Sequence, residues 1–311
     1  MARRASSKQQ GRAKPAKIGF LGATAPKAWS AFVEAFEQRL GQRGWTKGST
    51  VAIDYRWANG QPKQFASIAK SFAGDGVDVI VTSGTAPVVA AKKVTAKIPI
   101  VFAAAGDPVG TGLVASLARP GRNVTGLSNG AIKLAGRRLD ELRKALPGLK
   151  RLAILGNRDS SLIRLEMAEV AKQARKRKIA TVVCDVRRPT QIAPAMKRLK
   201  GKADALFVCT DPILSHHRSK ISTTATNAGL PTMHGFRDHV AAGGLMSYGP
   251  DFRDLFAGAA DLASKILHGA KPSGLAVKEP KKCELVVNAT TAAALGLTIP
   301  PAVLRRAEVI H

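Results

Sequence analysis

Residues 77–87 read Val-Asp-Val-Ile-Val-Thr-Ser-Gly-Thr-Ala-Pro, and the fold class can be inferred from this segment. Its apolar, β-branched start predicts a short buried strand. The small and hydroxyl residues that follow predict a turn, and the proline predicts the first turn of a helix. Residues 203–212 read Ala-Asp-Ala-Leu-Phe-Val-Cys-Thr-Asp-Pro and repeat this order. One strand-to-helix unit therefore occurs twice, about 130 residues apart.

Other apolar runs match between the two halves in the same way. Residues 18–22 correspond to residues 152–156, and residues 98–102 correspond to residues 230–234. Segments with apolar residues at spacings of three and four separate these runs, which predicts helices between the strands. A strand–helix–strand alternation implies parallel strands with right-handed crossovers. The sequence predicts an α/β protein of two doubly wound parallel-sheet lobes.

Composition agrees with two lobes. The chain has 311 residues, of which 45% are hydrophobic, so each half can bury a core. No run of 18 apolar residues occurs, so we expect no membrane-spanning segment. Cys184 and Cys209 lie in apolar runs, where buried thiols are expected rather than a disulfide or a metal site.

The net charge of +28 is unevenly distributed. Residues 128–202 contain 20 Lys and Arg against 6 Asp and Glu. A solvated surface and an anionic partner both fit such an excess. No aromatic residues interleave with these charges to stack on bases, so we expect no specific nucleic-acid binding. Residues 1–16 predict a disordered basic tail; it resembles the positive end of a signal peptide, but the apolar stretch that must follow is missing.

Ligand-binding residues are expected where the strands end. In open parallel α/β sheets, ligands bind beyond the carboxyl ends of the strands, near helix N-termini. Ser83, Thr85 and Asp211 occupy such positions, and Asp107 follows the strand near residues 99–104. Ordinary helix caps and loops are the alternatives for these residues.

The sequence contains no established catalytic or nucleotide-binding motif, neither G-x-x-x-x-G-K-[ST] nor G-x-S-x-G. Asp107 and Asp211 could form an acid–base pair, but nothing supplies a nucleophile, so we expect them to bind rather than catalyse. His216, His217, His234 and His239 lack the spacing of zinc ligands and are expected on the surface or as caps. The sequence therefore predicts no enzyme, no cofactor and no metal site.

Further segments of the chain belong together as one collinear set: residues 51–58, 77–84, 98–102, 106–110, 112–121, 123–128, 241–250, 265–272 and 295–301. In these segments the chain resembles the ABC transporter substrate-binding proteins, in particular the tryptophan/tyrosine-type members. The resemblance extends from about residue 17 to residue 308.

This resemblance implies a type I periplasmic-binding-protein fold with three crossovers at a hinge. Lobe 1 is expected at 17–126 plus 250–277, and lobe 2 at 127–249 plus 278–311. It also implies an importer component that closes on a small ligand. The leading candidate for this ligand is an amino acid, since the better-known members bind aromatic amino acids. The expected binding residues are Thr24, Ser83, Gly84, Thr85, Ala104, Asp107, Asp211, Phe236 and Tyr248.

The resemblance further implies a periplasmic protein that works with an ABC permease and an ATPase. Closure of the lobes needs no partner, so we expect a monomer. The chain departs from the family in lacking a visible export signal, which leaves a cytoplasmic location open. The alternative function is a ligand-sensing regulator or cytoplasmic sensor core with the same fold. A regulator would need a helix-turn-helix, and residues 1–17 are too short and unpatterned for one.

Overall fold

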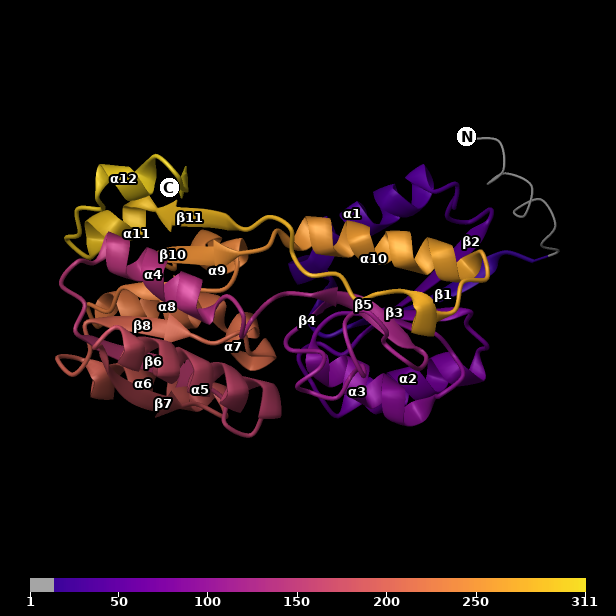
Figure 1. Ribbon diagram of the computed structural model, residues 1–311, viewed down its shortest axis with the longest axis horizontal. Helices are drawn as coiled ribbons and strands as arrows, with labels where there is room; N and C mark the ends of the chain where they lie inside the picture. The colour runs from indigo at the N-terminus through magenta and orange to yellow at the C-terminus, as the bar shows by residue number, and fades with distance from the viewer. Residues whose placement is uncertain (1–13) are drawn as a thin grey trace. The chain divides into compact units, whose positions relative to one another are not determined.

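The computed structural model describes residues 14–311. Within this range the chain forms two compact units (Figure 1). Unit 1 comprises residues up to 129 together with 252–280, and unit 2 comprises residues 130–251 together with 281–311. The chain therefore passes from one unit to the other three times. The predicted basic tail lies outside the described residues up to residue 13, and Ala16 is already a buried residue of the first strand.

Unit 1 is a three-layer structure around a five-stranded parallel sheet with the order β2-β1-β3-β4-β5. Helices α1 and α10 cover one face of this sheet, and α2 and α3 cover the other (Figure 1). Its elements are β1 (Ala16–Gly22), α1 (Pro26–Gln42), β2 (Val51–Trp57), α2 (Gln64–Gly74), β3 (Val79–Thr82), α3 (Thr85–Val94), β4 (Ile100–Ala105), β5 (Val124–Ser128), α10 (Phe252–Leu267) and the 3₁₀ turn η2 (Pro272–Gly274).

Aromatic side chains are scarce in the chain, yet several gather around Phe20 in the core of unit 1. The Phe20 ring is fully buried, and its centroid lies 5.7 Å from that of Phe36 on α1 and 6.3 Å from that of Phe256 on α10. Burying one such side chain contributes roughly 1.5–3 kcal/mol. The cluster therefore packs α1 and α10 against strand β1.

Unit 2 is built around a seven-stranded sheet with the order β12-β11-β10-β9-β8-β6-β7. All neighbouring strands are parallel except β10 and β11, which run antiparallel. Its elements are α4 (Ala135–Ala145), β6 (Arg151–Gly156), α5 (Ser161–Lys176), β7 (Ala180–Asp185), η1 (Pro189–Gln191), α6 (Ile192–Leu199), β8 (Ala205–Val208), α7 (Pro212–His216), α8 (Arg218–Asn227), β9 (Thr232–His234), α9 (Arg237–Ala241), β10 (Met246–Gly249), β11 (Glu284–Asn288), α11 (Ala289–Ala294), α12 (Pro301–Leu304) and β12 (Glu308–Ile310).

The two sheets share one strand order. In unit 1 the first five strands run 2-1-3-4-5, and β7-β6-β8-β9-β10 reproduces that order in unit 2. Strands at equivalent positions in the two sheets are also the ones that match in sequence: β1, β3 and β4 match β6, β8 and β9. The α/β fold of two doubly wound sheets is confirmed, as is the correspondence of the half-chains. No helix among the described residues is both long and apolar enough to cross a membrane.

Candidate ligand-binding site

The strand order fixes where each unit can bind a ligand. In unit 1, β1 lies between β2 and β3, so the chain leaves β1 and β3 toward opposite faces of the sheet. Such a switch point opens a crevice at the carboxyl ends of the two strands. Thr24 follows β1 and Ser83 follows β3, which places both at this edge. The equivalent point in unit 2 lies between β6 and β8.

Hydroxyl groups gather at the unit 1 edge. The Thr24 side chain is buried, and its Oγ1 has no hydrogen-bond partner within residues 14–311. The Ser83 hydroxyl lies 3.5 Å from the carbonyl oxygen of Ala104 on β4, which is a long hydrogen bond. A buried hydroxyl without a good partner costs about 1–3 kcal/mol, so a polar ligand group here would be favourable.

Gly84 and Thr85 connect β3 to α3 at the same edge. Gly84 adopts a φ of +92°, which a residue with a Cβ rarely adopts, and this turn begins α3 at Thr85. Oγ1 of Thr85 accepts a hydrogen bond from the backbone N–H of Gly106, which follows β4. The structure thus brings together five of the expected unit 1 residues, Thr24, Ser83, Gly84, Thr85 and Ala104.

Asp107 has a local role. Its Oδ1 accepts a hydrogen bond of 2.9 Å from the backbone N–H of Gly110, and its carbonyl oxygen accepts one from the hydroxyl of Thr111. A Cβ at position 110 would lie 2.0 Å from Oδ2 of Asp107, so the carboxylate folds tightly over this turn. Asp107 therefore shapes the loop after β4.

Asp211 lies at the switch point of unit 2 and is 2% exposed. It is the N-cap of α7, and its Oδ1 accepts hydrogen bonds from the N–H groups of Ile213 at 2.7 Å and Leu214 at 3.2 Å. No hydrogen bond within the described part of the chain reaches Oδ2. Burial raises the pKa of Asp211 to about 6, the charge of Glu166 adds to the increase, and the two capping hydrogen bonds oppose it. Oδ1 of Asp211 therefore caps α7, while Oδ2 can accept a further hydrogen bond.

A buried ion pair supports this region. Arg138 on α4 and Glu166 on α5 are both fully buried, with 3.4 Å between Nη1 and Oε1. Oε2 of Glu166 accepts hydrogen bonds from the N–H of Thr210 at 2.9 Å and from its hydroxyl at 2.6 Å. Burial raises the pKa of Glu166, while Arg138 and Thr210 oppose that change. The pair therefore fixes the residue that directly precedes Asp211.

Arg138 also links the strand ends of unit 2. Its Nε donates to the carbonyl oxygen of Tyr248 at 2.8 Å, and its guanidinium carbon lies 6.0 Å from the centre of the Phe236 ring. Its Nη2 is buried without a hydrogen-bond partner in the described chain. The backbone of Gly249 lies so close to the carbonyl oxygen of Gly235 that only glycine fits at position 249, because a Cβ there would lie 1.9 Å from that oxygen. Phe236 and Tyr248 are thus held at the edge that contains Asp211.

Sequence reasoning missed Arg138 and Glu166, although the pattern contained a signal. Arg138 lies on the buried face of α4 with Ala135, Leu139 and Leu142. Glu166 lies on the buried face of α5 with Ile163, Met167 and Val170. A charged residue at an apolar position is rarely buried unless it is paired. Two such residues of opposite sign on successive helices could have indicated the ion pair.

The expectation that the histidines lie on the surface is wrong for His234 and His239. Both rings are buried, and their centroids are 5.1 Å apart. Burial lowers the pKa of His239 to about 3, so this ring is neutral at pH 7. His234 is buried because its strand β9 is flanked on both sides by β8 and β10, and His239 on α9 stacks on the His234 ring. Among residues 14–311, no group of three or more His, Cys, Asp or Glu side chains could hold a metal ion.

Two doubly wound units joined by three chain crossings, each with polar residues at its switch point, define a type I periplasmic-binding-protein fold. The comparison with known families agrees: residues 23–310 match the family described as ABC transporter substrate binding protein, and the chain belongs to that family. This is a family of solute-binding proteins rather than enzymes, and its members work with transporter partners.

Known relatives are similar over nearly the whole chain. The tyrosine-binding protein of Clostridioides difficile is 28% identical over 271 residues, which cover 87% of this chain and 77% of the relative. A conserved domain protein of Vibrio cholerae has a TM-score of 0.90 at 30% identity, covering 95% of this chain and 99% of that one. A Streptococcus pneumonia ABC domain in complex with L-Trp also has a TM-score of 0.90, at 26% identity, covering 96% and 100% of the two chains.

Proposed function

We propose that this protein captures an amino acid, preferably an aromatic one, for an ABC importer and catalyses no reaction. Residues at the switch-point edges of both units would bind the ligand, and hinge closure at the three crossings would enclose it. Asp211 carries this proposal. It is a buried carboxylate with one uncommitted oxygen, at a strand end where ligands bind in this class of sheet.

The proposed recognition divides the ligand between the units. The hydroxyls of Thr24, Ser83 and Thr85 and the N–H groups at the start of α3 would receive the ligand carboxylate. Oδ2 of Asp211 would receive the ammonium group. Phe236 and Tyr248 would pack against the side chain, since aromatic rings favour offset or edge-to-face contacts with one another.

Two of the relatives support an aromatic amino acid. One is named for tyrosine, and one solved structure contains L-Trp. We further propose that the protein acts outside the cytoplasm as a monomer and delivers its ligand to a permease driven by an ATPase, as its family membership suggests. The Lys and Arg side chains within residues 128–202 would then form a solvated surface without specific affinity for nucleic acid.

Calorimetry with a small ligand panel tests the proposal. We expect L-tryptophan or L-tyrosine to bind more tightly than L-leucine. Indole-3-propionate lacks the ammonium group and tryptamine lacks the carboxylate, so each should lose most of the affinity of L-tryptophan. The proposal would be wrong if no amino acid bound, or if the two truncated analogues bound as well as the amino acid.

A further inference from the structure

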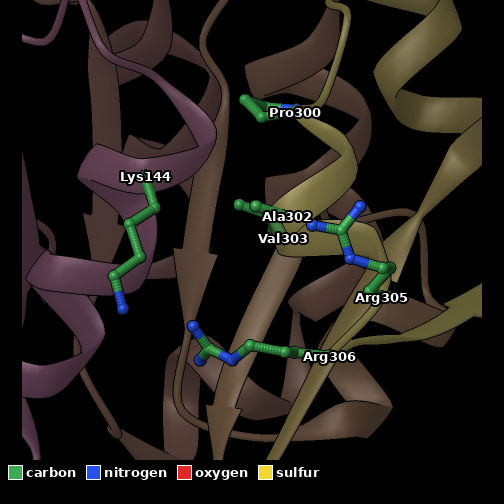
Figure 2. A pocket seen from close by; sticks show the side chains of 6 residues that line it. All are labelled: Lys144, Pro300, Ala302, Val303, Arg305 and Arg306. Atoms are coloured by element: carbon green, nitrogen blue, oxygen red, sulfur yellow. The ribbon is translucent and has the colours of Figure 1, made fainter.

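A cationic pocket lies on unit 2, apart from the residues discussed so far. It is a hollow of about 480 Å³ between α4 and the segment that contains α12. Figure 2 shows Lys144 extending from α4 and Arg306 extending from the facing segment. The residues that line it are Lys144, Pro300, Ala302, Val303, Arg305 and Arg306. Every charged side chain in this lining is a cation.

The carboxylate that meets these cations is Glu141, whose side chain is fully buried on α4. Its Oε1 accepts hydrogen bonds from Nζ of Lys144 at 3.1 Å and from Nη2 of Arg306 at 2.9 Å. The same oxygen lies 3.2 Å from Nε of Arg137. Burial alone would raise the pKa of Glu141, but the hydrogen bonds from Arg306 and Lys144 outweigh it and lower the pKa. One negative charge therefore faces three positive charges.

Arg305 increases this imbalance. Its side chain is exposed, and within residues 14–311 it forms neither an ion pair nor a hydrogen bond. Four cations around the pocket thus outnumber the two carboxylates that act on them, Glu141 and Asp140, of which Asp140 is close enough to Lys144 to feel its charge. Like charges held close together repel, and an anion with several acceptor oxygens relieves that repulsion.

We propose that this pocket binds a phosphate-bearing group. Lys144 Nζ and Arg306 Nη2 bond to the same oxygen, so the two nitrogens are no more than about 6 Å apart. Phosphate oxygens can each accept a hydrogen bond from a different donor, and guanidinium groups match phosphate geometry in a bidentate manner. The exposed guanidinium of Arg305 adds a donor that is not committed to a protein partner.

The pocket also fits more than an inorganic ion. A water molecule occupies about 30 Å³ in the liquid, so about 480 Å³ leaves room for an organic group attached to the phosphate. Pro300, Ala302 and Val303 supply an apolar wall for its carbon atoms. A soluble phosphomonoester and the headgroup of an anionic phospholipid share this chemistry.

The test measures binding of glycerol 3-phosphate by calorimetry at physiological salt, and of vesicles of phosphatidylcholine with and without phosphatidylglycerol by co-sedimentation. The pocket variant is Lys144→Gln/Arg305→Gln/Arg306→Gln. The control is Lys197→Gln/Arg198→Gln/Lys200→Gln, which removes the same charge from exposed positions at α6 in the same unit. Hydrogen bonds to charged groups predict at least about a tenfold loss of affinity in the pocket variant and less than about a twofold loss in the control.

Two single substitutions keep the proposal testable if the triple variant fails to fold. Arg305→Gln breaks no ion pair and should weaken binding several-fold. Glu141→Gln removes the opposing negative charge and should tighten binding, which a merely structural pocket would not do.

Binding of glycerol 3-phosphate alone would indicate a soluble phosphate compound. Dependence on phosphatidylglycerol would indicate a membrane headgroup. Equal losses in the pocket and control variants would mean that only the net charge attracts anions, and the proposal would be overturned. It would also be overturned if the wild-type protein bound neither probe.

Discussion

Replacing Asp211 by Asn should stabilise the protein while abolishing ligand binding. The raised pKa of Asp211, about 6 against an ordinary 3.8, means that ionising this carboxyl costs folding energy. At pH 7 this cost amounts to about 3 kcal/mol, since one pKa unit corresponds to about 1.4 kcal/mol. Asn keeps the capping oxygen and has no charge to bury, so we expect a gain of up to about 3 kcal/mol. A group that costs stability in its native position is typical of a functional site.

The pH dependence of this effect has a definite sign. Because the folded-state pKa is raised, the cost is present above pH 6 and disappears as the pH falls below the ordinary value of 3.8. The stability difference between Asp211→Asn and the wild type should therefore be largest at pH 7 and small at pH 4. Ligand affinity of the wild type should fall as the pH drops through 6, because a protonated carboxyl no longer attracts an ammonium group.

Urea unfolding at pH 7 and pH 4 measures the stability change, and calorimetry with the best amino-acid ligand measures binding. Asp204→Asn is the matched control. Burial opposes the ionisation of Asp204, but hydrogen bonds from Arg151 and the backbone outweigh it and lower its pKa, so this variant should lose stability. The reasoning about Asp211 fails if Asp211→Asn is no more stable than the wild type at pH 7. An affinity loss below about 0.5 kcal/mol would leave Asp211 as a helix cap alone.

Four further expectations can be checked with similar measurements. Thr24→Val removes a buried hydroxyl that lacks a partner, so stability should not fall, while affinity for the amino acid should drop roughly two- to tenfold by calorimetry. Gly249→Ala should cost roughly 1–3 kcal/mol in urea unfolding because its Cβ meets a carbonyl oxygen, whereas Gly148→Ala, with nothing near its Cβ, should be almost neutral. Glu166→Gln leaves Arg138 buried without a counter-charge and should cost roughly 3–5 kcal/mol; a loss below about 1 kcal/mol would contradict the pairing. Saturating ligand should reduce the radius of gyration in small-angle scattering, and an unchanged profile would contradict hinge closure.

Much of the fold could be predicted because its determinants are local. The apolar run of β3 and the hydroxyl-rich turn after it lie within ten residues of each other, and β8 repeats the pattern. Two details could not be read from such runs. The helical segment after β8 is divided in two, since α7 ends at His216 and α8 begins at Arg218, with no Gly or Pro between them to mark the break. The antiparallel pairing of β10 with β11 joins segments far apart in the chain.

The candidate site was predictable in part for the same reason. Ser83 directly follows β3 and Asp211 comes three residues after β8, so strand order alone places them at the switch points. Arg138 and Glu166 lie 28 residues apart on different helices, and their contact depends on how α4 and α5 pack. The burial of His234 likewise depends on the two strands that flank β9. Long-range packing of this kind leaves only an indirect trace in the sequence.

The three chain crossings have a consequence for synthesis on the ribosome. Unit 1 is completed by α10, which packs on α1, β3, β4 and β5, yet α10 is translated only after most of unit 2. The ribosome adds roughly 5–20 residues per second. The apolar sheet face around Phe20 therefore remains uncovered for roughly 6–25 seconds, the time between the emergence of β5 and that of α10. Unit 2 likewise remains incomplete until β11 and β12 have been translated. A nascent chain of this design therefore exposes two unfinished cores at once, and a stop codon near residue 251 would leave neither unit able to fold.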